Sequence, residues 1–295
     1  MKIAISSLPK KPWWSDGIIG YKDNPFMKNG TVPNQNLLIK ERLNLINRLK
    51  ANKIEVIELP FPTILEKTKF GHDYVFIRDS FISDLNGNVL MLNFAEKNRQ
   101  AEIEIVGNEL EKLDFNLNEL PNKNNIHAEG GEFYFCPKDK LLFSGIKRNT
   151  IKGAEHVASF LNVNELILIE TPSFHLDTVF ATVLDKQGAL CAMIVCKELI
   201  AKNSFKDLEK ISKKLNIQII IVPKKDSIGT SKHLGSLAVN SFCSPGLLIS
   251  SSNYSNIWVE RKLKELNVNR EICPVSQFQI SGGSVHCLTN ELLSY

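Results

Sequence analysis

Five amphipathic helical stretches recur along the chain at intervals of about fifty to sixty residues, which indicates a repeated structural unit. They cover residues 34–52, 97–113, 151–161, 198–215 and 255–266. In the first stretch Leu38, Leu45 and Leu49 share one face, as in a half-buried helix. Short apolar runs bounded by turn residues predict two or three strands around each helix. The pattern therefore predicts an α/β fold of ββαβ modules.

The predicted strands lie at 54–59, 74–77, 88–92, 133–135, 141–145, 166–170, 178–184, 192–196, 217–222, 236–242 and 246–251. Residues 116–126, which are rich in asparagine, are expected to form a loop. No Pro/Gly/Ser-rich stretch or charge block divides the chain. We therefore expect residues 1–295 to form a single domain.

The composition is that of an ordinary globular protein, with 43% hydrophobic and 23% charged residues and a net charge of +4. The lysines are scattered and no basic aromatic stripe indicates a nucleic-acid partner. No apolar window has the length of a membrane helix. The six cysteines include no CxxC pair and follow no secretory segment, which predicts free thiols in the cytoplasm. Without paired CxxC or HExxH spacing, we expect no metal site and no cofactor.

Two segments pair chemically active residues with apolar strands. ISGGSVHCLTNEL carries two adjacent glycines before Cys287, and such glycines allow close approach or positive φ. Taken alone, a loop followed by a buried cysteine is the more common explanation. In SFHLDTVFATVL, His175 and Asp177 alternate with Leu176, so on a strand they would point to the same side. An exposed strand end explains that pair equally well.

Two further segments place carboxylates where apolar strands begin. Glu129 precedes two glycines in IHAEGGEFYF, and Asp79 follows Arg78 inside the apolar run YVFIRDSFI. Either could belong to an exposed strand end or a surface ion pair. Together the four segments supply a thiol, an imidazole and three carboxylates at strand ends in different modules. Because enzymes build their sites where strand ends converge, the combination predicts an active site.

The blocks RDSFI, EGG, FHLDTVF and GGSVHCLT, in this order, resemble the signature of the guanidino-modifying superfamily. IGYKDNPFM and the helix and strand after it are also similar to the opening of these proteins. The superfamily includes arginine deiminases and dihydrolases, amidinotransferases and dimethylarginine dimethylaminohydrolases. The resemblance implies a five-bladed, pseudo-symmetric α/β propeller, a small guanidino substrate and no metal or cofactor. The oligomeric state stays open, a homo-oligomer included.

Roles for six residues follow from the resemblance. It implies Cys287 as the nucleophile, His175 as general acid and base, and Glu129 as the group that orients His175. Asp79 and Asp177 would bind the guanidinium group. GIKRNTIKGAEHVA is similar to a segment whose arginine binds a substrate carboxylate, which implies Arg148, although the glycine spacing is one residue shorter here. His286 borders the nucleophile and could shape the pocket, and its role stays open.

The implied reaction passes through a Cys-S-amidino intermediate and releases ammonia or an alkylamine and a ureido product such as citrulline. A carboxylate at 177 suits an unsubstituted guanidinium, which offers it two N–H donors, and so favours arginine over methylated arginine. Amidino transfer and dimethylarginine hydrolysis are alternatives. A Cys–His acyl hydrolase would not need two further carboxylates. A ribosome-binding factor of the same fold would lack the catalytic set.

Overall fold

The structure, a computed structural model, describes residues 1–22, 24, 27–121, 125–230 and 233–294. Within these residues the strands form five separate three-stranded sheets. In every sheet the middle strand pairs antiparallel with one neighbour and parallel with the other. Each parallel pair is joined through a helix, which is the ββαβ order predicted from the sequence. The α/β prediction and its five-module rhythm are therefore confirmed.

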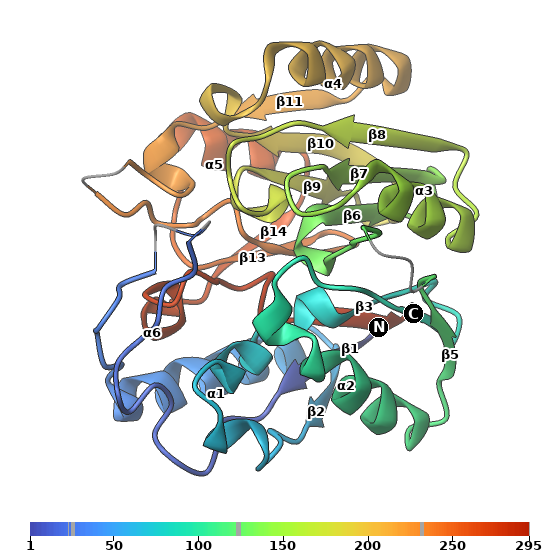
Figure 1. Cartoon of the computed structure of the whole chain (residues 1–295). Coiled ribbons are helices and arrows are strands. Elements are labelled where there is room, and N and C mark those ends of the chain that lie inside the picture. The colour runs from blue at the N-terminus through green and yellow to red at the C-terminus, as the bar shows by residue number, and fades with distance from the viewer. Residues whose placement is uncertain (23, 25–26, 122–124, 231–232, 295) are drawn as a thin grey trace.

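Four of the modules follow one another along the chain. They are β3 (Phe81–Ser83), β4 (Asn88–Met91), α2 (Ala101–Glu111) and β5 (Asn116–Glu119); β6 (Phe133–Cys136), β7 (Leu141–Gly145), α3 (Ile151–Phe160) and β8 (Glu165–Ile169); β9 (Phe180–Leu184), β10 (Leu190–Val195), α4 (Lys202–Leu215) and β11 (Gln218–Ile221); and β12 (Phe242–Ser244), β13 (Leu247–Ser250), α5 (Ile257–Glu265) and β14 (Asn269–Ile272). The five long helices lie around the outside of the molecule (Figure 1).

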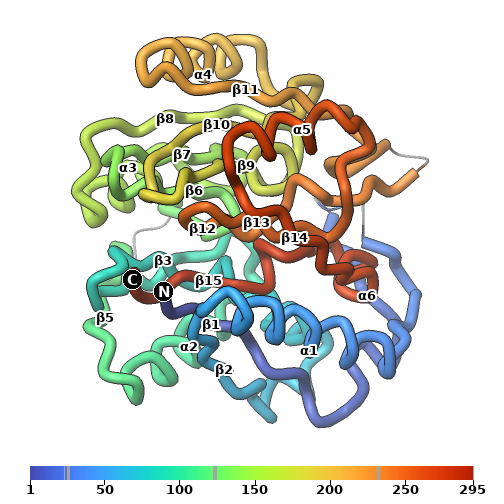
Figure 2. The backbone as a smooth tube through the Cα atoms, turned by 180° about the vertical axis from the view of Figure 1, so that it is seen from behind, coloured from blue at the N-terminus to red at the C-terminus, as the bar shows by residue number. Residues whose placement is uncertain are grey.

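The fifth module joins the two ends of the chain. It consists of β1 (Lys2–Ser6), α1 (Gln35–Ala51), β2 (Glu55–Leu59) and, from the C-terminal end, β15 (Asn290–Leu293). Because β15 pairs antiparallel with β1, the two termini lie close together (Figure 2). The short helix α6 (Ser276–Gln279) leads from the fourth module back toward β15. This pairing closes the circle of modules.

Helix α1 shows how the local sequence sets an element. The Asn34 side chain accepts a hydrogen bond from the Leu37 amide at 3.1 Å and caps the first turn. Leu38, Leu45 and Leu49 are buried, as their period predicts. None of the described helices is both long and apolar enough to cross a membrane.

Three local predictions are wrong. Residues 74–77 form no strand: they span the end of the 3₁₀ helix η2 (Gly71–Val75), the linking residue Phe76 and the start of η3 (Ile77–Ser80). In 236–242 only the last residue enters a strand, β12. Both segments are apolar because they are buried, and a short apolar run does not distinguish a strand from a buried turn. The predicted loop at 116–126 begins with β5, while residues 122–124 lie outside the described residues.

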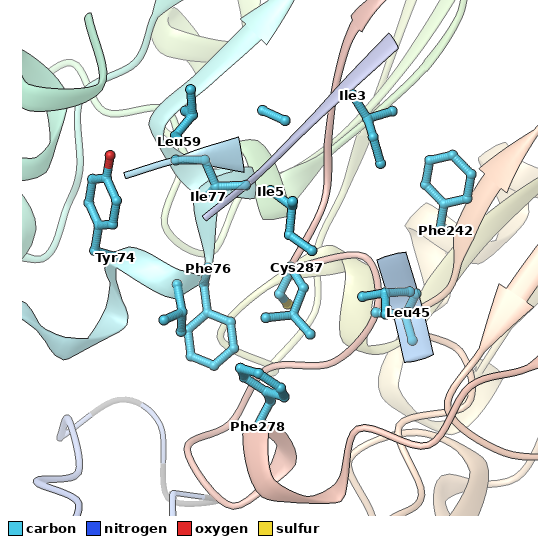
Figure 3. Packing of buried hydrophobic residues seen from close by; sticks show 14 of the residues in the cluster. Ile3, Ile5, Leu45, Leu59, Tyr74, Phe76, Ile77, Phe242, Phe278 and Cys287 are labelled. Carbon is cyan, nitrogen blue, oxygen red and sulfur yellow. The ribbon is translucent and has the colours of Figure 1, made fainter. Parts of the chain in front are cut away.

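The largest apolar cluster joins β1, β2 and α1 to the segment before β15. Cys287 belongs to this cluster, and Figure 3 shows it among Ile5, Phe76 and Phe278. Gly282, in the turn that leads to the cysteine, has φ +93°, a conformation that favours glycine. The fold thus packs Cys287 into the largest apolar cluster, directly before β15.

Candidate active site

Five side chains that could bind or react with a ligand occupy corresponding places in the five modules. Each lies in the short segment just before the first strand of its ββαβ module, which is β15 in the module that joins the chain ends. They are Asp79 before β3, Glu129 before β6, Asp177 before β9, Asn240 before β12 and Cys287 before β15. The five first strands surround an axial cavity of about 570 Å³. The segments that lead into these strands therefore converge beside it. Neither Cys287 nor His175 lines the cavity itself.

In the segment before β9, the side chains of His175 and Asp177 contact different partners: His175 contacts Glu129, and Asp177 contacts Cys287. His175 is extended (φ −138°, ψ 150°), and Leu176–Thr178 then form the 3₁₀ helix η6 before the strand begins at Phe180. The predicted strand alternation, with both side chains on one side, is therefore wrong. The buried carboxylate of Glu132 fixes the turn by accepting hydrogen bonds from the Leu176 and Arg148 amides, both at 2.8 Å.

The imidazole side of the site comprises Asp79, Glu129, Arg148 and His175, all buried. His175 Nε2 lies 2.7 Å from Glu129 Oε2, and Nδ1 lies 3.7 Å from Asp79 Oδ1. Burial lowers the pKa of His175, but Asp79 and the hydrogen bond to Glu129 outweigh it and raise this pKa to about 9. At neutral pH the imidazole is therefore protonated and can donate a proton.

Arginines balance the two carboxylates beside His175. Arg148 Nη1 lies 3.0 Å from Glu129 Oε2, and Arg99 Nη1 lies 2.6 Å from Asp79 Oδ2. Arg99 also forms a two-pronged pair with the buried Glu102. Burial raises the pKa of Glu129, but Arg148 and His175 outweigh it and hold this pKa well below its usual value. Glu129 is therefore a carboxylate while it contacts His175.

Glycine makes the close approach of these groups possible. The Gly131 amide donates a hydrogen bond to Asp79 Oδ1 at 2.9 Å. A Cβ at position 131 would come within 2.6 Å of His175 Nδ1 and 2.9 Å of Asp79 Oδ1. The second glycine of the EGG block thus leaves room for the imidazole.

The sulfur side comprises Asp177, Asn240, His286 and Cys287, also buried. The Cys287 thiol donates to Asp177 Oδ2 across 3.4 Å, and Asn240 Nδ2 donates to Cys287 Sγ across 3.2 Å. His286 Nδ1 lies 2.9 Å from the same oxygen of Asp177. The other oxygen, Oδ1, is buried and has no hydrogen-bond partner within the described residues.

The groups around Cys287 keep its sulfur protonated. Burial, followed by the negative charges of Asp177 and Asp79, raises the pKa of the Cys287 thiol well above its usual value. Burial also raises the pKa of Asp177, but the hydrogen bond from His286 outweighs it and lowers this pKa overall. A buried carboxylate oxygen without a donor is costly, and a ligand N–H would satisfy it. The sulfur side is thus arranged to receive a cation.

Ligand atoms of Asp79, Glu129 and His175 approach within 4.8 Å of one another, as they would around a metal ion. Both carboxylates already pair with arginine, and His175 carries a proton at neutral pH. A metal requires neutral imidazole and would compete with two guanidinium groups. The cluster therefore suits a protonated imidazole better than a metal ion.

The structure brings all six residues singled out from the sequence into the two sides of one site. Three contributing residues were missed: Arg99, Glu132 and Asn240. Arg99 was assigned to the start of a helix and Asn240 to a strand, and neither segment carried a charge pattern that indicated a site. Glu132 was the one of the three that the sequence could have indicated, because it follows the EGG block directly.

One family model, described as "N,N dimethylarginine dimethylhydrolase, eukaryotic", matches residues 21–294. No curated protein matches the chain. Among solved structures, the N-terminal domain of ArgZ, a cyanobacterial arginine dihydrolase, bound to its substrate, has 21% identity and a TM-score of 0.79 and covers 99% of this chain and 98% of that one. DDAH from Pseudomonas aeruginosa, complexed with citrulline, has 14% identity and a TM-score of 0.71, with 98% of both chains covered.

The structural likeness confirms the predicted five-bladed α/β propeller. The family assignment rests on the family model, which matches nearly the whole chain. Because that family consists of hydrolases, the alternative of a ribosome-binding factor is rejected. The chain therefore belongs to the N,N-dimethylarginine dimethylhydrolase family within the guanidino-modifying superfamily, and it is a hydrolase that acts on guanidino compounds.

Proposed function

We propose that this enzyme hydrolyses the guanidinium group of arginine or a close relative through a covalent S-amidino intermediate on Cys287. The observation that carries the proposal is Asp177 Oδ1, which is buried and has no hydrogen-bond partner among the described residues, while Asp177 Oδ2 contacts the Cys287 thiol. An unsubstituted guanidinium supplies N–H donors to that oxygen and brings its carbon to the sulfur. The cyanobacterial neighbour ArgZ, an arginine dihydrolase, supports this substrate class.

Binding of the cation would activate the nucleophile. In the free enzyme, burial and two carboxylates disfavour the thiolate, so Cys287 keeps its proton. A guanidinium between Asp79 and Asp177 would offset both charges and favour ionisation, with the thiol proton released to solvent. The sulfur then attacks the guanidinium carbon and forms a tetrahedral adduct.

His175 would move the remaining protons. Its imidazolium, held by Glu129 at 2.7 Å, donates a proton to the departing nitrogen, and the S-amidino intermediate remains on Cys287. The neutral imidazole next removes a proton from a water molecule, which attacks the same carbon and releases the thiolate. The products are ammonia and a ureido compound, which is citrulline when arginine is the substrate.

Dimethylarginine is the second candidate substrate, because the matching family model is described by that activity. Its methyl groups replace N–H donors and would leave Asp177 Oδ1 poorly paired in a buried position. Amidino transfer would use the same intermediate, with an amine in place of water. Arg148, which contacts Glu129, stays a predicted anchor for a substrate carboxylate.

The test is a colorimetric assay of ureido product with arginine, agmatine, methylated arginines and guanidino acids. The wild type should turn over arginine or a relative with an unsubstituted guanidinium, and Cys287→Ala should be inactive. Cys273→Ala is a matched control, since Cys273 is a buried cysteine of the same cluster. Activity confined to methylated arginine would refute the substrate assignment. If Arg148 anchors a carboxylate, Arg148→Lys should weaken arginine turnover more than that of agmatine, which has no carboxylate.

The proposal includes the cellular location, the binding partners and the oligomeric state of the enzyme. The six cysteines form no disulfide, which supports a reducing, cytoplasmic location. We expect small guanidino compounds to be its binding partners, and size-exclusion chromatography with light scattering would determine whether it is a monomer or a homo-oligomer.

A further inference from the structure

The position of Asn240 in the fold gives the first reason to examine it. Four of the five modules place a residue with a proposed catalytic or binding role just before their first strand: Asp79, Glu129, Asp177 and Cys287. In the remaining module, that of β12, β13, α5 and β14, this place is held by Asn240, which is 1% exposed. The pseudo-symmetry thus directs a fifth side chain into the same site.

The hydrogen bonds of Asn240 fix which end of its amide faces the sulfur. Its Oδ1 accepts from the His286 amide at 3.0 Å and from the Cys287 amide at 3.3 Å. Backbone amides only donate, so the oxygen must lie on their side and the NH₂ group must point away from them. That NH₂ group lies 3.2 Å from Cys287 Sγ. The orientation follows from the network.

Asn240 and Asp177 act on the sulfur in opposite ways. Asp177 Oδ2 can accept the thiol proton, but it repels the sulfur once that proton has left. The Asn240 NH₂ group can donate to the sulfur in both states, and a hydrogen bond to a charged acceptor is the stronger one. Among the described residues, Asn240 is the side chain with a hydrogen bond donated to this sulfur.

We propose that Asn240 is a thiolate-positioning residue, whose amide aims the Cys287 sulfur and stabilises its ionised form during attack on the guanidinium. The inference rests on the proposed function for its role in turnover. The effect on the sulfur is a property of the free enzyme and can be measured without any substrate.

The experiment follows the rate of Cys287 alkylation by iodoacetamide against pH, with each modified peptide identified by mass spectrometry. Asn240→Asp keeps an acceptor for both backbone amides but loses the donor. Asn240→Ser replaces the amide donor by a hydroxyl on a shorter side chain without adding charge. Each should raise the pH midpoint by about one unit, which is a roughly tenfold lower alkylation rate at a given pH below the midpoint. Asn240→Asp should show the larger shift.

Asn290→Ser is the control for a merely structural effect. The Asn290 amide is equally buried, but its NH₂ group donates to the carbonyls of Arg78 and Phe81 and not to the sulfur. This variant should lower the melting temperature and leave the alkylation midpoint unchanged. An unchanged midpoint in folded Asn240→Ser and Asn240→Asp would overturn the proposal, as would an equal shift in Asn290→Ser.

A measurement on the intact site covers the case in which the Asn240 variants do not fold. In the wild type, the Asn240 side-chain amide protons should shift in the NMR spectrum as the thiol ionises, and in Cys287→Ala they should not. Chemical shifts of the Asn240 amide protons that stay constant while the thiol titrates would refute the inference. Neither readout needs turnover, so a failed substrate assay would count only against the proposed function.

Discussion

The imidazole side and the sulfur side of the site lie next to each other but are built from different groups. His175 lies close to two acidic side chains, Glu129 and Asp79, and each of them pairs with an arginine. Around Cys287 the neighbours are a neutral amide, a histidine whose pKa burial lowers, one carboxylate and the apolar core. The first side keeps a proton on the imidazole, and the second keeps the sulfur un-ionised, a state that we propose changes when the guanidinium cation binds.

The largest effect is expected from Cys287→Ala, which removes the nucleophile and should lower turnover by a factor on the order of 10⁴ or more. The imidazole side should remain intact, because within the described residues His175 forms its polar contacts with Glu129, Asp79 and Arg148. Ureido-product formation measures the loss. Turnover within tenfold of the wild type would show that another group attacks the substrate.

His175→Ala should lower turnover by about 10²–10⁴, since proton transfer to the leaving nitrogen and from water would both be lost. The sulfur side should be unaffected, so iodoacetamide should still modify Cys287 with an unchanged pH midpoint. A midpoint that moves by more than one unit would show that the two sides are coupled in the free enzyme and would break the comparison.

Asp177→Asn should lower kcat/KM for arginine by about 10²-fold, because a neutral amide replaces the acceptor that we assign to the guanidinium. The loss for methylated arginines should be smaller, as they offer fewer N–H donors. Kinetics on both substrates measure the difference. Equal losses would argue that Asp177 has only a structural role.

Gly131→Ala should lower kcat by about tenfold, since the new Cβ would lie within 2.6 Å of His175 Nδ1 and displace the ring. The alkylation of Cys287 should not change. A wild-type kcat in this variant would mean that the position of the imidazole tolerates a shift.

The smallest expected effect is a pH dependence of stability. The folded-state pKa of His175 is raised from 6.5 to about 9, so its stabilising contribution is complete below pH 6.5 and is lost as the pH rises through 9. The loss is at most about 3 kcal/mol. Denaturant titrations at pH 7 and pH 9 should show a smaller difference for Glu129→Gln than for the wild type. Burial also raises the pKa of Glu102 and Glu132 from 4.5 to about 7, so their contribution to stability is lost as the pH rises from 4.5 through 7, mostly before the His175 contribution is lost.

Much of the fold could be predicted because each module carries one amphipathic helix. The spacing of apolar residues in such a helix is easy to recognise in a sequence. The strands next to the site were harder to predict. Tyr74–Ile77 and the residues before Phe242 are apolar yet form buried turns, and short apolar runs do not report their backbone conformation. The short pairing that closes the circle, β15 with β1, depends on a partner nearly the whole chain away.

The candidate site was predictable where charged residues interrupt apolar runs, as at Asp79, Glu129 and His175. Asn240 was not, because a neutral amide in VNSF carries no signal until the loop before β12 is placed against Cys287. Arg99 was hidden for a similar reason, since an arginine at the start of a helix is usually exposed and this one is 3% exposed. Residues that belong to the site only through tertiary contacts can be identified only from the structure.

The central claim is that Cys287 forms a bond to the guanidinium carbon while His175 supplies the proton. Rapid quenching of the enzyme during turnover of arginine, followed by intact-mass and peptide mass spectrometry, tests it directly. The account predicts an adduct on Cys287 with the mass of the substrate less ammonia, which forms more slowly in His175→Ala. An enzyme that forms the ureido product without this adduct during steady turnover, or with one on another residue, would contradict it.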